Sequence, residues 1–183
     1  KCSGLRWICV MLLTPISWLN RIWALPFLTV LAPSERYHEK KGKPHKTLSD
    51  WARQICLLLS FWLPDFQLIM LGDGSYAVRA LLAATLDKIT WIVRFRMDGS
   101  LYDFPPPRKK GQMGRPPIKG EQQSSLEDRL NAPKTKWKKM KFSNWYGQEN
   151  KTMEFATGTA IWYRGGEPAV PIRWVIVRGM SST

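Results

Sequence analysis

A helix, strand, helix, strand order in the middle of the chain constrains its fold most. Apolar side chains recur at helical spacing over residues 49–62, and Thr47 and Ser49 both offer caps for this helix. Residues 66–72 form an apolar run of strand length, 76–86 return to a helical pattern, and 89–96 are again of strand type. A strand between two helices is typical of a parallel strand, so this order predicts an α/β layer. The first helix is expected to bury one face, made of Trp51, Ile55, Leu58, Leu59 and Trp62.

Strand-like runs also flank this central part. Residues 5–16 and 23–32 are apolar, and the polar break Asn20–Arg21 separates them, which predicts two adjacent strands of a buried sheet. Residues 134–178 hold further β-type runs, which we expect to be antiparallel. The breaks between those runs are expected at Gly147, Gly165–Gly166 and Pro171.

The charge of the chain is unevenly distributed. The 28 Lys and Arg outnumber the 14 Asp and Glu and give a net charge of +14. Residues 88–141 alone carry 14 basic and 5 acidic side chains, which is +9 of that total. Because such a surface attracts negative charge, a polyanion is the leading partner.

Much of this positive charge lies in and after a segment rich in proline and glycine, residues 103–120, which predicts a loop or an extended arm. Cations interleaved with glycine, proline and an aromatic ring suit contact with a phosphate backbone and stacking on exposed bases. A solvated loop is the simpler alternative. The candidate nucleic-acid-binding residues are Arg108, Lys109, Lys110, Arg115, Lys119, Lys134, Lys136, Trp137, Lys138, Lys139 and Lys141.

Two other classes of protein are disfavoured. Residues 7–33 are apolar, but Arg21, Pro15 and Pro26 divide them into runs shorter than the ~20 residues of a spanning helix, so we expect a cytoplasmic protein without a membrane segment. Three cysteines without a CxxC motif, beside only two histidines, favour neither a disulfide framework nor a zinc site. We expect Cys2, Cys9 and Cys56 to be buried thiols.

Asp73 is the carboxylate most informative about chemistry. It follows a strand-like run and precedes a Gly74–Ser75 turn, so we expect it to be exposed in a crevice at the carboxyl end of a central strand, where open α/β sheets bind ligands. A carboxylate held there suits a hard divalent cation. A cap on the following helix explains the position of Asp73 more simply. Glu35, Asp50, Asp87, Asp98 and Asp103 lie in loop, cap or turn contexts, where we expect solvated carboxylates.

Several separated blocks carry a resemblance to a known family. They are WALPFLTVLAPSERY (23–37), HKTLSDWAR (45–53), LGDGSYAV (71–78), SLYD (100–103), the Pro/Arg stretch 105–117, WYG (145–147), GTAIWY (158–163) and VPIRW (170–174). In this order they resemble a bacterial insertion-sequence transposase of the DDE type. The resemblance covers nearly the whole chain, and ordered blocks are more specific than any one motif.

The resemblance implies a ribonuclease-H-like fold, in which three carboxylates hold two divalent ions, Mg²⁺ or Mn²⁺, that cut and rejoin DNA. Asp73 matches the second carboxylate. The first Asp is expected before Lys1 and the final Glu after Thr183, and residues 178–183 depart from the Arg-Asp-Pro expected there. One ligand cannot hold two ions about 3.5–4 Å apart, so unaided catalysis is not expected.

The expected organisation is an incomplete domain: a partial ribonuclease-H-like core lacking its first strand over 1–98, a basic Pro/Gly-rich loop over 99–133, and a β-rich insertion over 134–183 that stops before the last catalytic helix. The first functional hypothesis is therefore a fragment of a transposase that binds transposon ends and target DNA, with an oligomer possible in the intact family. The alternative is a non-catalytic, basic nucleic-acid-binding module.

Overall fold

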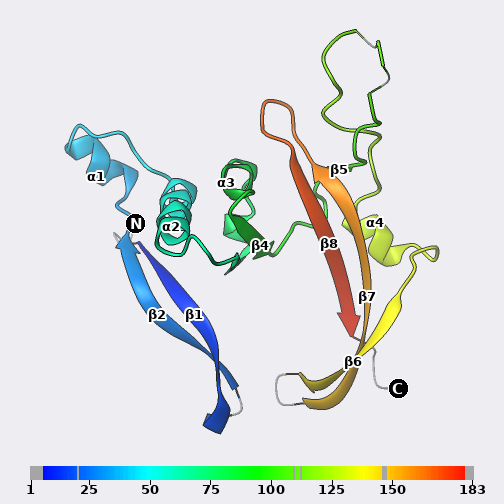
Figure 1. Cartoon of the computed structure of the whole chain (residues 1–183), viewed down its shortest axis with the longest axis horizontal. Coiled ribbons are helices and arrows are strands. Elements are labelled where there is room, and N and C mark those ends of the chain that lie inside the picture. Colours follow the sequence, from blue (N-terminus) through cyan, green and yellow to red (C-terminus); the bar gives the residue numbers. More distant parts are fainter. Residues whose placement is uncertain (1–5, 20, 109, 112, 146–147, 180–183) are drawn as a thin grey trace. The chain divides into compact units, whose positions relative to one another are not determined.

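The computed structural model describes residues 6–19, 21–108, 110–111, 113–145 and 148–179, and it shows a mixed α/β chain with several small sheets (Figure 1). The chain divides into two compact units, residues 1–70 with 84–90 and residues 71–83 with 91–183. The α-helices are α1 (Glu35–Lys40), α2 (Leu48–Trp62), α3 (Arg79–Thr85) and α4 (Leu126–Asn131). The strands are β1 (Trp7–Ile16), β2 (Arg21–Leu31), β3 (Leu68–Gly72), β4 (Ile89–Val93), β5 (Leu101–Tyr102), β6 (Lys138–Trp145), β7 (Gln148–Trp162) and β8 (Val170–Gly179).

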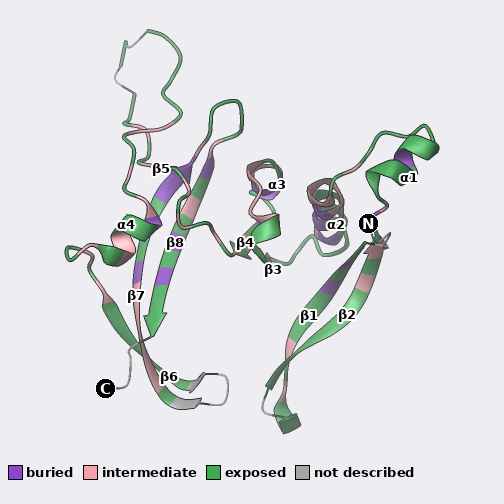
Figure 2. Cartoon of the chain, turned by 180° about the vertical axis from the view of Figure 1, so that it is seen from behind, coloured by how far each residue is buried: buried purple, intermediate pink, exposed green. Residues whose placement is uncertain are grey.

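In the first unit, β1 and β2 form an antiparallel hairpin, as the two apolar runs predicted. Ile8 and Val10 of β1 are buried in a cluster with Ile55 and Leu59 of α2. The rest of the hairpin is largely exposed, so the expectation of a buried sheet was wrong (Figure 2). The helix covers one face only, and large apolar side chains on these strands, such as Trp7, lie open to solvent.

Helix α2 begins one residue before the predicted range 49–62, because of the two candidate caps it is Thr47 that forms a reciprocal cap with Asp50. The Asp50 backbone N–H donates to Thr47 Oγ1 at 3.2 Å, and the Thr47 backbone N–H donates to Asp50 Oδ2 at 3.0 Å. The buried face is rotated from the predicted one and consists of Ala52, Ile55, Cys56 and Leu59. Leu58 and Trp62, expected in that face, are 38% and 51% exposed, because the helix packs on the hairpin cluster through Ile55 and Leu59.

Short helices differ most from the prediction. Helix α1 follows β2 where only the end of a strand was expected, and α4 lies in the segment expected to be loop. Helix α3 begins at Arg79 rather than at residue 76, because Gly74–Tyr76 form a single 3₁₀ turn instead. Helices of six or seven residues are too short to produce a clear apolar period, although Ser125 and Asp128 do form a capping box before α4.

In the second unit, β7 pairs antiparallel with β5, β6 and β8, which confirms the antiparallel arrangement predicted for the last third. Pro171 lies inside β8 opposite Ile161 rather than at a break, and β8 pairs in the described residues with β7 alone. An edge strand tolerates a residue without an N–H. The predicted break at Gly147 lies outside the described residues. The core of this unit gathers residues of α3, β5, α4, β7 and β8, among them Leu82, Leu101, Leu126, Ala160 and Trp174.

Strands β3 and β4 pair with each other as a two-stranded sheet, and the division between the two units runs through both. In the described part of the chain β3 therefore has one neighbouring strand, not the central position that the sequence suggested. No helix among the described residues is both long and apolar enough to cross a membrane.

Candidate metal-binding turn and nucleic-acid interface

Asp73 directly follows β3 and caps the 3₁₀ turn Gly74–Tyr76. Its Oδ1 accepts hydrogen bonds from the Ser75 backbone N–H, at 2.8 Å, and from the Ser75 hydroxyl. The Tyr76 backbone N–H also interacts with this carboxylate, and the side chain is exposed. The carboxylate is thus held in the turn by hydrogen bonds and remains exposed to solvent, and the capping role considered from the sequence is real.

The hydroxyl of Ser75, and then its backbone N–H, hold the pKa of Asp73 below its usual range. The turn is tightly built, since a Cβ at Gly72 would lie 3.1 Å from the Tyr76 ring. That ring stacks on Trp91 with 6.3 Å between centroids, and burial raises the pKa of the Tyr76 hydroxyl. Asp73 therefore gives up its proton at a lower pH than an ordinary aspartate, on a turn anchored by a stacked aromatic pair.

The described residues contain no group of three or more His, Cys, Asp or Glu side chains placed to hold a metal ion. Asp50 is used in the cap of α2, the Asp98 carboxylate pairs with Arg96 at 2.6 Å, and Asp103 accepts a hydrogen bond from Gln123. Asp73 can supply one ligand to a divalent cation. The part of the chain that is described does not by itself complete a site for two ions.

The proline-rich segment forms an arm closed at its base. The Asp103 N–H donates to the Glu121 carbonyl and the Gly120 N–H donates to the Asp103 carbonyl, both at 2.8 Å. A Cβ at Gly120 would lie 2.8 Å from the Phe104 carbonyl oxygen, so the closure requires glycine. The Lys119 ammonium lies 3.4 Å from the centroid of the Tyr102 ring and is used in this closure.

The remaining predicted cations of the arm lie between these closing contacts. Arg108 donates to the Gly114 carbonyl at 3.1 Å, and Lys110 and Arg115 are exposed. Lys109 lies outside the described residues. The arm therefore carries exposed positive charge on a loop whose ends are fixed by the β-rich unit.

The remaining candidate nucleic-acid-binding residues lie in two different parts of this unit. Lys138, Lys139 and Lys141 are exposed along β6, whereas Lys134 and Lys136 line a pocket beside α4. Trp137 is half-buried against the core, and the Arg178 guanidinium lies 3.9 Å from its ring centroid. That cation covers one face of the ring on which a base was expected to stack.

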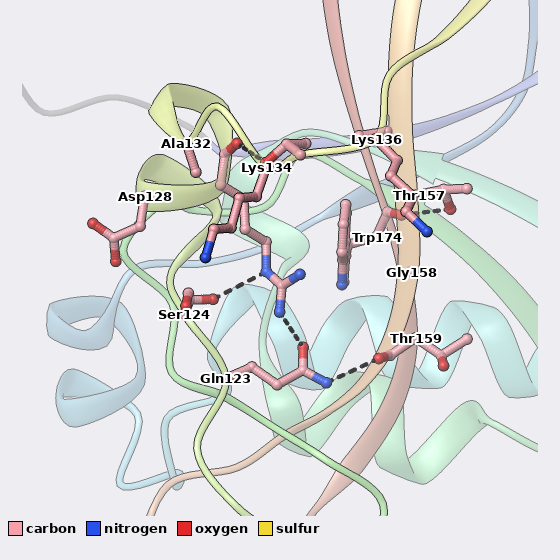
Figure 3. Close-up of a pocket in the computed structure, with 13 residues that line it drawn as sticks. Gln123, Ser124, Asp128, Ala132, Lys134, Lys136, Thr157, Gly158, Thr159 and Trp174 are labelled. Atoms are coloured by element: carbon pink, nitrogen blue, oxygen red, sulfur yellow. Dashed lines mark hydrogen bonds between the residues drawn. The ribbon is translucent and has the colours of Figure 1, made fainter.

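The pocket was not predicted from the sequence. It has a volume of about 550 Å³ and is lined by residues 123–136 of the α4 region and by strands β7 and β8 (Figure 3). Arg129, Gln123 and Trp174 form part of its wall, and none of the three was a candidate site residue. No local motif marks them, because contacts between segments distant in sequence bring them together: Gln123 donates to the Thr159 carbonyl, and the Arg129 guanidinium lies near the Trp174 ring.

The sequence matches the family described as DDE superfamily endonuclease over residues 1–169. The chain therefore belongs to this family, and the match supports a DDE-type transposase domain with nuclease-like or transposase-like function at the family level. Endonucleases of this superfamily generally use divalent metals, and the family implies a DNA substrate. Searches of curated proteins and of solved structures gave no match.

Proposed function

We propose that Asp73 is a metal-binding carboxylate of a DDE transposase with a ribonuclease-H-like catalytic domain, which binds the ends of an insertion sequence and cleaves and transfers DNA strands. One observation carries this proposal: Asp73 is an exposed carboxylate at the end of β3, with a lowered pKa, inside the segment that matches the family. When bound, Mg²⁺ or Mn²⁺ would activate the attacking oxygen and stabilise the leaving oxygen.

The residues of this chain would orient the metal-binding carboxylate and supply its negative charge. Ser75 fixes the orientation of the Asp73 carboxylate and favours its ionised form, and the exposure of this side chain would allow it to face a cation. The resemblance assigns three carboxylates to the metal site, and Asp73 is the residue of this chain that matches one of them. We therefore expect these residues alone to bind a divalent ion weakly and not to cleave DNA.

DNA binding is proposed for the exposed cations of the arm and of β6. Lys110 and Arg115 lie in the arm, and Lys139 and Lys141 are separated by one residue in β6, which places them on one face of that strand. Cations that neutralise phosphates release counterions, so affinity falls as salt rises. We also predict a cytoplasmic location and an oligomer for the intact protein.

A salt titration of DNA affinity tests this role. Replacing Lys138, Lys139 and Lys141 of β6 together with Ala should weaken binding and reduce the salt slope by about 2.1–2.7, since each lost phosphate contact removes about 0.7–0.9. The matched control replaces three exposed cations elsewhere, Arg21, Lys88 and Arg164. Equal slopes for both triple variants would contradict an interface at these lysines, whereas Asp73→Asn should leave affinity unchanged.

The alternative is a non-catalytic nucleic-acid-binding module. It is favoured by the finding that Asp73 has no cluster of metal-ligating side chains around it in the described residues. The two functions differ in one measurable property, the affinity of Asp73 for a divalent cation. A module that only binds DNA should bind such a cation no more tightly at Asp73 than at its other exposed carboxylates.

A further inference from the structure

The pocket beside α4 holds a cation that is fixed in place. Arg129 Nε donates to the Ser124 carbonyl and one of its terminal nitrogens donates to Gln123 Oε1, both at 3.2 Å. Gln123 is itself oriented by donating to the Thr159 carbonyl at 3.2 Å (Figure 3). The guanidinium also lies 5.1 Å from the centroid of the Trp174 ring. A cation held in this way loses little freedom when a ligand binds.

Arg129 differs from the arginines of this unit that form ion pairs in the charge of its partners. Arg79 pairs with Glu167, Arg96 with Asp98 and Arg178 with Glu154. Arg129 has no carboxylate partner among the described residues, since a carbonyl, an amide oxygen and an aromatic ring hold it. Its charge is therefore left for a ligand to neutralise.

The rest of the lining adds to this positive charge. Lys134 and Lys136 line the same pocket, and the one acidic lining residue, Asp128, accepts hydrogen bonds from Ser125 in the cap of α4. Trp174 is only 7% exposed, and its indole N–H meets no acceptor among the described residues. The lining therefore combines three cationic side chains with one carboxylate that is already hydrogen-bonded.

We propose that this pocket binds a phosphate group of a nucleic-acid strand. An arginine fork with lysines beside it is the donor set that recognises phosphate oxygens. The volume of about 550 Å³ is enough for a nucleotide unit. The proposal deepens the proposed function, because it rests on DNA as the partner and assigns a phosphate-binding site remote in sequence from Asp73.

The test measures fluorescence anisotropy of a labelled single-stranded oligodeoxythymidylate of about ten nucleotides, within the length that such sites bind. Arg129→Gln should weaken binding about tenfold, the loss expected for one hydrogen-bonded charged contact. The matched control is Arg173→Gln, which removes the same charge from an exposed residue next to Trp174 on the opposite face of β8, and which should change affinity less than twofold.

A second variant tests the pocket even if Arg129→Gln does not fold. Lys134→Gln with Lys136→Gln alters two exposed side chains of the pocket, so it should fold normally and still weaken binding severalfold. Wild-type affinity in both pocket variants would overturn the proposal.

Two further oligonucleotides identify the source of the phosphate. If a methylphosphonate backbone abolishes the difference between wild type and Arg129→Gln, the pocket binds an internal phosphate. If the difference appears only with a 5′-phosphorylated strand, it binds a terminal one. Both results support the site. Because the role of Asp73 is tested by metal binding, failure of the pocket and failure of the catalytic assignment are distinguishable.

Discussion

Gly158 of β7 and Trp174 of β8 are directly opposite each other, and the indole fills the space that a side chain at Gly158 would need. A Cβ there would lie 2.5 Å from Cζ2 of the ring. Trp174 is buried and cannot swing out without opening the core of the unit. Residue 158 must therefore be glycine, because Trp174 on the neighbouring strand occupies the space that a side chain would need.

Gly158→Ala should destabilise the β-rich unit by about 1–3 kcal/mol, the usual effect of overpacking a core. Thermal unfolding followed by circular dichroism measures the change. Gly165→Ala is the matched control, because a Cβ at Gly165 meets nothing within 4 Å and should leave the melting temperature nearly unchanged. Equal melting temperatures for both variants would contradict the close packing.

The cap of α2 gives a second prediction. Thr47→Ala should lower the free energy of unfolding by about 1 kcal/mol, because the Asp50 backbone N–H loses its acceptor. Lys43→Ala, in the exposed loop before the helix, is the control and should have little effect.

The same cap predicts a pH dependence. The hydrogen bonds from Thr47 lower the pKa of Asp50. The Asp50 carboxylate therefore stabilises the folded chain at pH values above the ordinary carboxyl pKa, and this stabilisation is lost as the pH falls through the lowered pKa. The stability difference between the wild type and Asp50→Asn should shrink on acidification. A difference that stays constant from neutral to acidic pH would argue against this cap.

Thiol reactivity should distinguish two cysteines. Burial raises the pKa of Cys56 to about 11, whereas Cys9 is exposed on β1, contrary to the buried thiol expected there. Cys2 lies outside the described residues. Iodoacetamide at pH 8 should label Cys9 rapidly and Cys56 slowly, as mass spectrometry of the separate peptides would show, because the thiolate is the nucleophile. Equal labelling rates in folded protein would refute the burial of Cys56.

Ser75 should control the ionisation of Asp73. In Ser75→Ala the carboxylate loses the hydroxyl that contributes most to its lowered pKa, so the pKa should rise toward the ordinary carboxyl range. Carboxyl carbon chemical shifts followed by NMR during acid titration measure it. An unchanged titration midpoint would show that the Ser75 hydroxyl does not interact with Asp73 in solution.

The fold was predictable where a local signal is strong. Thr47 with Asp50 marks the start of α2, and the polar break near Arg21 marks the hairpin. The burial of β1 and β2 was not predictable, because an apolar sequence says what could be buried and not what covers it. Trp7 and Leu58 are exposed for that reason, since contacts with other elements decide which face is covered.

The candidate site, like the fold, was predictable only where a local sequence signal marks the residue. Asp73 could be located because it stands between a strand-like run and a turn. Arg129 could not, since the features that distinguish it are contacts with Gln123 and Trp174 and the absence of a carboxylate partner in the described residues. Lys119 shows the opposite error. Its positive charge predicted a contact with DNA, but in the structure its ammonium group lies on the Tyr102 ring.

The central claim is that Asp73 is a metal-binding carboxylate, and paramagnetic broadening by Mn²⁺ tests it most directly. In NMR spectra of the chain with substoichiometric Mn²⁺, the amide signals of Ser75 and Tyr76 should broaden first, and Asp73→Asn should abolish this. Asp65, an exposed carboxylate just before β3, is the matched comparison, and Asp65→Asn should leave the broadening at Ser75 intact. Equal broadening around Asp65 and Asp73, or persistence of the effect in Asp73→Asn, would contradict the account.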